Sequence, residues 1–91
     1  VTLRLYVAGT TPQSTRAIVS AREFCDEYLA GRYQLEVVDI YQRPTLARDE
    51  QIVAVPTLVK QLPLPLRRLV GDLSMTERVL IGLDLVEGRK S

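Results

Sequence analysis

The chain has 91 residues, of which 46% are apolar and 25% charged, a composition typical of a globular protein with one domain spanning residues 1–91. Its 12 lysines and arginines nearly balance its 11 aspartates and glutamates, which argues against nucleic-acid binding driven by phosphate contacts. The absence of histidine excludes Ser–His and Cys–His nucleophile pairs and most zinc and iron sites.

The chain has a single cysteine, Cys25, and this limits disulfide formation and indicates the type of cellular compartment. One cysteine cannot form an intramolecular disulfide, which is consistent with a reducing compartment, so we expect a cytoplasmic location. No signal-peptide pattern opens the sequence as given. The longest uncharged apolar run is far shorter than the roughly 20 residues that a membrane helix needs, so we expect no membrane association.

The chain begins with a predicted strand and a predicted helix. Residues 2–8 alternate between apolar and other side chains, which is typical of a strand. Thr11 and Pro12 then predict a helix start, with a hydroxyl N-cap and proline at the first helical position, and Gly31 predicts its end. The helix carries one apolar stripe, made of Ala17, Ile18, Ala21, Phe24, Cys25, Tyr28 and Leu29.

Residues 33–40 predict a second strand. It starts by alternating and becomes apolar on both faces at Val38, so we expect it to be mostly buried. A strand, a helix and a second strand in this order form a βαβ unit, which is parallel and right-handed in nearly all proteins.

The second half of the chain predicts a short helix over residues 45–53 and strands over residues 57–62 and 66–70. With a helix at the end, the element order βαβ–α–ββ–α is that of an α/β, thioredoxin-like fold. Pro56 lies where that fold keeps a cis-proline before its third strand, so we expect a cis bond there. Residues 63–65, Pro-Leu-Pro, are an awkward connector for a tight hairpin.

The last segment carries conflicting local signals. Residues 74–77, Ser-Met-Thr-Glu, form a capping box and predict a helix start. The buried stripe of that helix would be Met75, Val79, Leu80, Leu83 and Val86. Residues 79–85 also alternate as a strand does, and Gly82 costs a helix about 1 kcal/mol relative to alanine. We therefore expect tertiary context to decide the structure of residues 78–86.

No part of the sequence predicts a catalytic site. A thioredoxin-like enzyme needs a thiolate at the start of the first helix, but the loop over residues 9–14 contains no cysteine, and Cys25 lies on the apolar stripe as a core residue. A glutathione-type transferase using Ser14 or Thr11 is an alternative, but it needs a second helical domain, for which a chain of this length has no room. We expect no enzymatic activity, no metal and no cofactor.

Four stretches of the chain together resemble the KaiB family, and the similarity spans nearly the whole sequence. They are residues 5–9 with Thr11, Pro12, Ser14 and Arg16; residues 38–40 with Pro44 and Leu46; residues 56–58; and Arg67-Arg68 with residues 71–74 and 79–85. The last stretch, which ends in Ile81-Gly82-Leu83-Asp84-Leu85, is the most specific. A related sensor domain of a clock histidine kinase shares the fold but matches these stretches less well.

The resemblance implies a non-enzymatic clock protein that acts by binding other proteins. KaiB proteins are metamorphic, with a ground state that is commonly tetrameric and a rarer, monomeric, thioredoxin-like state that binds the KaiC ATPase hexamer. In cyanobacterial systems the bound form also captures KaiA and competes with the sensor kinase. The conflict over residues 78–86 would then mark a segment that changes between helix and strand. The alternative is a thioredoxin-like sensor domain that docks on a histidine kinase.

The resemblance also suggests which basic residues bind KaiC. Arg16, Lys60 and Arg67 match basic positions of the family, and Arg68 is a further candidate. Basic groups suit an acidic partner surface, although each could instead be a solvated surface charge. Glu36 changes the charge of the second strand, the edge expected to meet KaiA, so KaiC binding is better supported than KaiA binding.

Three residues are candidates for setting the balance between two folds. Gly82 weakens a helix, and Asp84 is a poor strand residue, so each disfavours one of the two structures of this segment. Pro56 is the third candidate because of its expected cis peptide bond. The alternative for Gly82 and Asp84 is ordinary turn or surface chemistry.

Overall fold

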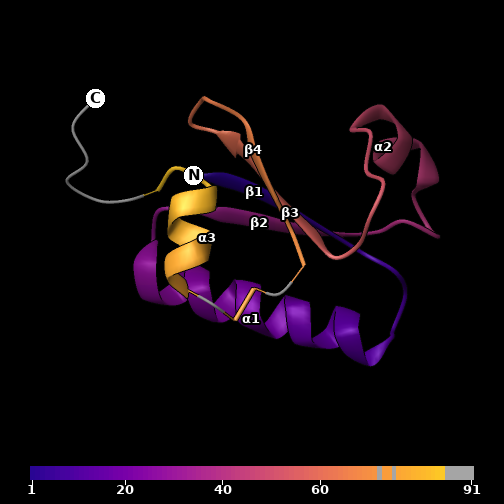
Figure 1. Cartoon of the computed structure of the whole chain (residues 1–91), viewed down its shortest axis with the longest axis horizontal. Coiled ribbons are helices and arrows are strands. Elements are labelled where there is room, and N and C mark those ends of the chain that lie inside the picture. Colours follow the sequence, from indigo (N-terminus) through magenta and orange to yellow (C-terminus); the bar gives the residue numbers. More distant parts are fainter. Residues whose placement is uncertain (72, 75, 86–91) are drawn as a thin grey trace.

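The computed structural model describes residues 1–71, 73–74 and 76–85, except for the side chains of Thr76 and Glu77. Four strands and three helices are found in these ranges (Figure 1). In chain order they are β1 (Thr2–Val7), α1 (Pro12–Tyr28), β2 (Gln34–Asp39), α2 (Pro44–Asp49), β3 (Thr57–Leu62), β4 (Arg67–Val70) and α3 (Thr76–Gly82).

The strands form one mixed sheet in the order β2-β1-β3-β4. Strand β1 pairs with β2 in parallel, whereas the pairs β1–β3 and β3–β4 are antiparallel. Helices α1 and α3 pack on one face of the sheet, and α2 lies on the other (Figure 1). This is the α/β, thioredoxin-like arrangement that the order of elements predicts.

A cluster of hydroxyl groups fixes the start of α1. Thr11 is the N-cap, and its Oγ1 accepts a hydrogen bond from the Ser14 amide at 3.1 Å. The buried Ser14 Oγ accepts a hydrogen bond from the Ala8 amide at 3.1 Å and donates one to the Ala8 carbonyl at 3.3 Å. The predicted cap therefore also ties the end of β1 to the first turn of α1.

The C-terminal end of α3 forms a Schellman motif. The Leu85 amide donates to the Leu80 carbonyl at 2.8 Å, and the Asp84 amide donates to the Ile81 carbonyl at 3.1 Å. Asp84 has a φ of 57°, the left-handed conformation usually taken by glycine at this position but tolerated by aspartate. Leu80 and Leu85, which the motif brings together, line the same surface pocket.

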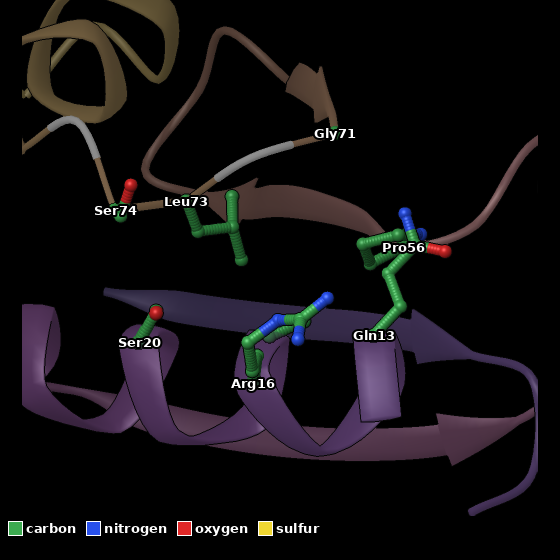
Figure 2. A pocket seen from close by; sticks show the side chains of 8 residues that line it. Gln13, Arg16, Ser20, Pro56, Gly71, Leu73 and Ser74 are labelled. Carbon is green, nitrogen blue, oxygen red and sulfur yellow. The ribbon is translucent and has the colours of Figure 1, made fainter. Parts of the chain in front are cut away.

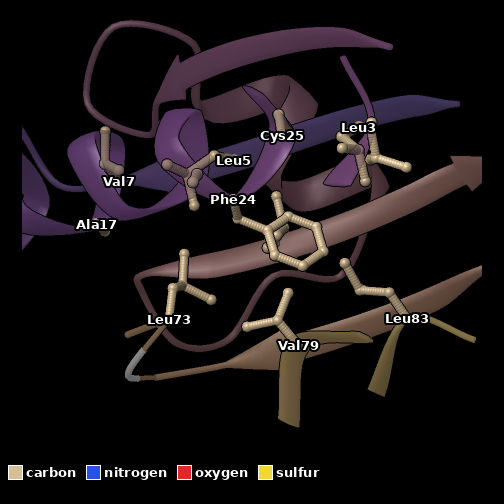
Figure 3. Close-up of a cluster of buried hydrophobic side chains, with 12 residues drawn as sticks. Leu3, Leu5, Val7, Ala17, Phe24, Cys25, Leu73, Val79 and Leu83 are labelled. Atoms are coloured by element: carbon tan, nitrogen blue, oxygen red, sulfur yellow. The ribbon is translucent and has the colours of Figure 1, made fainter. Parts of the chain in front are cut away.

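The main core lies between the sheet and the pair α1 and α3 (Figure 3). Its buried side chains are Leu3, Leu5, Val7, Ala17, Ala21, Phe24, Cys25, Leu29, Leu58, Leu73, Val79 and Leu83. Helix α3 itself contributes Val79 to this core, and Leu83 follows directly after the helix. A smaller cluster under α2 is made of Tyr6, Val38, Ala47 and Val59.

Most predicted elements are confirmed with small changes at their ends, but the short helix expected over residues 45–53 spans only Pro44–Asp49, and Gln51 just after it has a non-helical φ of 56°. The strand over residues 57–62 and the start of α1 at Pro12 are correct, and α1 ends at Tyr28, before Gly31, which has a φ of 73° in the following turn. The peptide bond before Pro56 is cis, as expected, and those before Pro63 and Pro65 are cis as well.

The conflict over the last segment is decided for helix in residues 76–82. Val79 and Leu83 of the predicted stripe are buried and Leu80 is half-buried, whereas Ile81, on the alternative strand pattern, is exposed. Met75 and Val86 lie outside the described residues, as does the Glu77 side chain of the predicted capping box.

The prediction that the second strand is mostly buried is wrong. Strand β2 lies at the edge of the sheet, and Val38 is its only fully buried residue. Gln34 and Glu36 are exposed, while Leu35 and Val37 are half-buried. The run of apolar residues at Val38 reflects the second core cluster under α2 and not a central position in the sheet.

We expect Leu5→Ala to lower the free energy of unfolding by about 3 kcal/mol, because Leu5 is fully buried where β1 meets α1 and β3 and its truncation leaves a cavity. Urea denaturation followed by circular dichroism measures this loss. The matched control is Val53→Ala, since Val53 is 97% exposed and its truncation should change stability by less than about 0.5 kcal/mol. Equal losses in the two variants would contradict this account of the core.

Candidate protein-binding site

A groove of about 340 Å³ lies between the first half of α1 and the loops that flank β3 and β4 (Figure 2). Gln13 and Arg16 reach from α1 toward Pro56, and Ser20 lies one turn further along the helix (Figure 2). The opposite wall is formed by Pro56, Gly71, Leu73 and Ser74, and Ala17 completes the lining. No carboxylate lines this groove among the described residues, so Arg16 is its only charged group there.

The other two predicted binding residues lie side by side on the sheet. Lys60 of β3 and Arg67 of β4 are cross-strand partners, and Lys60 also pairs with Leu3 of β1. Because Leu3 belongs to the main core and cross-strand partners share a face, both basic side chains belong to the face covered by α1 and α3. Lys60 is three residues, or about 10 Å, from the start of β3, which lies beside Pro56, and Arg67 is opposite Lys60 on β4.

Lys60 is not a solvated surface charge in this structure, because it is only 1% exposed. Burial lowers the pKa of Lys60 from its ordinary value of 10.5, and the nearby Arg67 guanidinium lowers it further. The carboxylate of Asp84, at the end of α3, acts in the opposite direction and raises this pKa. Arg16 and Arg67 are exposed, so these two present positive charge at the surface.

Arg68, the further candidate, points to the other face of the sheet and is already engaged. Its Nη1 donates a hydrogen bond to the Gln51 carbonyl at 3.1 Å, and its Nη2 lies 4.0 Å from Glu50 Oε2. Glu50 also accepts a hydrogen bond from Gln61 Nε2 at 3.0 Å and lies 3.7 Å from Arg4 Nη1. These contacts attach the end of α2 to β1, β3 and β4.

The same network extends to the β2 edge through Glu36. Arg4 Nε lies 2.9 Å from Glu36 Oε1, and Arg43 Nη1 lies 3.0 Å from Glu36 Oε2. The hydrogen bond from Arg43 and the contact with Arg4 lower the pKa of Glu36, so its carboxylate stays ionised at neutral pH. On the α2 side, Arg4, Arg43 and Arg68 are thus paired with carboxylates. Arg16 and Arg67 have no ion pair among the residues that the structure describes.

The structure places two candidate switch residues, Pro56 and Asp84, near predicted binding residues, and it places Gly82 against β4. Pro56 lines the groove that contains Arg16. Asp84 interacts electrostatically with Lys60, as described above. Gly82 lies against β4, because a Cβ built on it would be 3.2 Å from Leu69 Cδ1.

The side chains that could support catalysis are occupied or buried. Thr11 Oγ1 donates a hydrogen bond to Ser14 Oγ at 2.8 Å, so the two hydroxyls bind each other and the backbone. Burial raises the pKa of the Cys25 thiol to about 11, so this thiol stays protonated at neutral pH. Within the described residues there is no cluster of potential metal ligands and no helix long and apolar enough to cross a membrane.

The sequence suggested Arg16 as a binding candidate but did not predict the groove around it. Gln13, Arg16 and Ser20 are spaced by three and four residues, so the helical period alone places them on one side of α1. Leu73 and Ser74 come from a distant part of the chain, and only the tertiary structure brings them opposite this helix.

Comparison with known proteins identifies close relatives. A sequence model of the KaiB domain matches residues 4–85. The circadian clock oscillator protein KaiB of Synechococcus elongatus is 51% identical over 86 residues, which cover 94% of this chain and 84% of that protein. The protein of the same name from Prochlorococcus marinus is 54% identical over 84 residues, covering 92% and 72%. The circadian clock protein KaiB3 of Synechocystis is 45% identical over 86 residues, covering 94% and 84%.

Solved structures support the fold. The N-terminal domain of SasA from Synechococcus elongatus superimposes with a TM-score of 0.75 at 26% identity, covering 98% of this chain and 88% of that domain. Mitochondrial thioredoxin 3 of Saccharomyces cerevisiae gives a TM-score of 0.72 at 14% identity, covering 93% and 77%, which shows the fold alone. The thioredoxin-like fold predicted from the sequence is confirmed.

We expect Lys60→Met to raise the free energy of unfolding by about 1 kcal/mol at pH 7, because it replaces a buried charge by an apolar side chain of similar length. The lowered pKa means that the cost of burying the ammonium is fully present below the folded-state pKa. That cost is relieved as the pH rises from there to 10.5. The advantage of Lys60→Met should therefore shrink between pH 7 and pH 10 in urea denaturation.

Arg67→Met is the matched control for this experiment. Arg67 is a basic neighbour on the same face but is exposed, so its replacement should leave stability within about 0.5 kcal/mol at both pH values. A loss of stability in Lys60→Met that is the same at pH 7 and pH 10 would show that Lys60 is not buried as a charge.

Proposed function

The chain belongs to the KaiB family, and on this premise we propose that it is a clock regulator that binds a KaiC-like ATPase hexamer and catalyses no reaction itself. The observation that carries the proposal is the pair of exposed arginines, Arg16 and Arg67, on the face covered by α1 and α3. Neither has an ion pair among the described residues, whereas Arg4, Arg43 and Arg68 on the α2 side are paired with carboxylates. A cytoplasmic location is part of the proposal.

The absence of enzymatic activity is supported by the chemistry at the start of α1. Ser14 and Thr11 use their hydroxyl groups to cap the helix, and the buried Cys25 thiol stays protonated. The position where a thioredoxin-like enzyme needs a thiolate therefore serves to hold the fold together. This arrangement supports a binding function over a glutathione-type transferase.

The proposed KaiC-binding residues are Arg16, Lys60 and Arg67. Arg16 and Arg67 would meet acidic groups of the partner directly, which speeds encounter and sets orientation. Lys60 is buried and interacts with Asp84, just after α3, so a direct contact would require the chain that covers Lys60 to move. While Lys60 stays buried, its ammonium group adds to the positive electrostatic potential around its cross-strand neighbour Arg67.

We further propose that the structure described here is the binding-competent member of two folds. In the other, residues around Gly82 and Asp84 would leave the helix, and the chain would associate into dimers or tetramers. If the binding-competent fold is rare, the apparent affinity for KaiC falls by its populated fraction. Its slow formation would then delay complex assembly, which is the property that a timer needs.

Other partners in this proposal are KaiA and a clock histidine kinase. The β2 edge, where KaiA binding was expected, presents Glu36 held between Arg4 and Arg43. A KaiA-like partner would therefore meet a pre-organised carboxylate, and this part of the proposal has less support than KaiC binding.

A second candidate function is that of a sensor domain that docks on a histidine kinase. The observation that favours it is the similarity in fold to the N-terminal domain of SasA, with a TM-score of 0.75. The two functions differ in oligomeric state, because a sensor domain should be monomeric and should not change its fold.

The proposed function is tested by size-exclusion chromatography with light scattering. We expect the protein alone to be a multimer, and we expect a complex containing monomers of this chain to form over hours with a KaiC hexamer and ATP. Arg16→Glu and Arg67→Glu should each weaken the complex about tenfold or more, since each reverses a charge facing the partner.

Arg48→Glu is the matched control, because Arg48 is an exposed arginine on α2 with no ion pair among the described residues. It should bind KaiC as the parent chain does. A monomer that never joins KaiC would support the sensor-domain function instead, and equal weakening by all three variants would indicate a general charge effect.

Gly82→Ala should favour the thioredoxin-like fold and speed complex formation with KaiC, because alanine stabilises a helix by about 1 kcal/mol relative to glycine. The gain is reduced by the Leu69 side chain, which must shift slightly to accommodate a Cβ that would lie 3.2 Å from its Cδ1. Stopped-flow or manual mixing with KaiC measures the rate of complex formation. An unchanged oligomeric state together with an unchanged rate would exclude Gly82 from this role.

A further inference from the structure

Strand β4 has an open edge. It is the last strand in the order β2-β1-β3-β4, and in the part of the chain that the structure describes it pairs only with β3. Half of the backbone amide and carbonyl groups of an edge strand point away from its neighbour and can pair with another extended segment. This edge is therefore competent to accept a further strand.

A groove of about 440 Å³ lies beside this edge, between β4 and α3. It is lined by Leu69 and Val70 of β4 and by Arg78, Ile81 and Gly82 of α3. Leu69 is half-buried on the α3 side of β4 and Ile81 is 67% exposed, so apolar side chains border the groove from both elements. The lack of a side chain on Gly82 allows α3 to approach Leu69 closely, which makes the two elements one continuous surface.

The charge around the groove is positive. Arg78 is exposed, and among the described side chains it has no ion pair and no carboxylate lines the groove. Arg67 adds a second guanidinium group on the same face of β4. A second copy of this chain pairing edge to edge about a two-fold axis would place these arginines against their own counterparts, which is unfavourable. The charges instead suit an acidic partner.

We propose that the β4 edge and this groove bind an extended, acidic segment of a partner protein, which adds as a strand to the sheet. Backbone hydrogen bonds to β4 would supply affinity, and alternate side chains on one side of the segment would supply selectivity. Apolar side chains on the α3 side of the segment pack against Leu69 and Ile81, and a carboxylate two residues away pairs with Arg78. The inference goes beyond the proposed KaiC binding, because this groove is separate from the one that contains Arg16.

The test uses a labelled, end-capped peptide of eight residues with the full chain. Valine and glutamate alternate at its odd positions, and threonine fills the even positions. We expect saturable binding by fluorescence anisotropy, with the largest amide NMR shifts in residues 67–70 and 76–82. Two control peptides should bind about tenfold more weakly or not at all: one with lysine for glutamate, and one with proline at the central threonines, which removes amide donors.

Matched variants locate the site on the protein. Arg78→Glu and Ile81→Glu should each weaken binding of the glutamate peptide about tenfold, since one reverses the charge and the other places a carboxylate in the groove. Arg48→Glu and Val53→Glu make the same changes at exposed positions outside the groove and should bind as the parent chain does. All four positions are exposed, so circular dichroism should show that the variants keep the parent fold.

The proposal is overturned if the glutamate peptide does not bind saturably, if the lysine peptide binds as well, or if amides of β4 do not shift. It is also overturned if binding is insensitive to Arg78→Glu and Ile81→Glu. Binding to KaiC is measured separately with the same variants, so a chain that fails to bind KaiC can still support or contradict the peptide site.

Discussion

The contact of Val79 and Leu83 with the sheet holds the C-terminal helix in place, and the rest of this face depends on that contact. Both side chains are fully buried in the main core beside Phe24 and Leu58. Because α3 is only seven residues long, packing and not helix propensity must stabilise it. The chain leading into it forms a wall of the Arg16 groove, and the turn after it places Asp84 near Lys60. Movement of α3 would therefore alter both groups of proposed binding residues together.

The sequence predicts the fold well where local chemistry and tertiary packing agree. Thr11 and Pro12 begin α1 as expected, since a hydroxyl cap and a helical proline require no distant partner. Strand β2 was expected to be buried and lies at an edge, because the position of a strand in a sheet depends on pairing that its own residues do not encode. The burial of Lys60 was missed for the same reason, since only the tertiary structure buries this residue of β3 and brings Asp84 close enough to interact with it.

The two faces of the sheet differ in whether their arginines form ion pairs. On the α2 face, Glu36 and Glu50 bind three arginines and join all four strands, so its charges are used within the chain. On the α1 and α3 face, Arg16, Arg67 and Arg78 present charge without described ion pairs. Exposed pairs contribute little to stability, so leaving arginines unpaired costs the fold little while it provides a field that can orient an acidic partner. This division explains why Arg68, although adjacent to Arg67, has a structural role.

The small apolar contact that holds α3 also has a thermal consequence. Burial of apolar surface has an enthalpy close to zero near 25 °C and is driven almost entirely by entropy. An equilibrium constant with little enthalpy changes little with temperature, so the contribution of Val79 and Leu83 to the docking of α3 is nearly constant over a range of temperatures around this point. The use of two aliphatic side chains thus makes their contribution to the equilibrium constant for docking of α3 nearly independent of temperature around 25 °C.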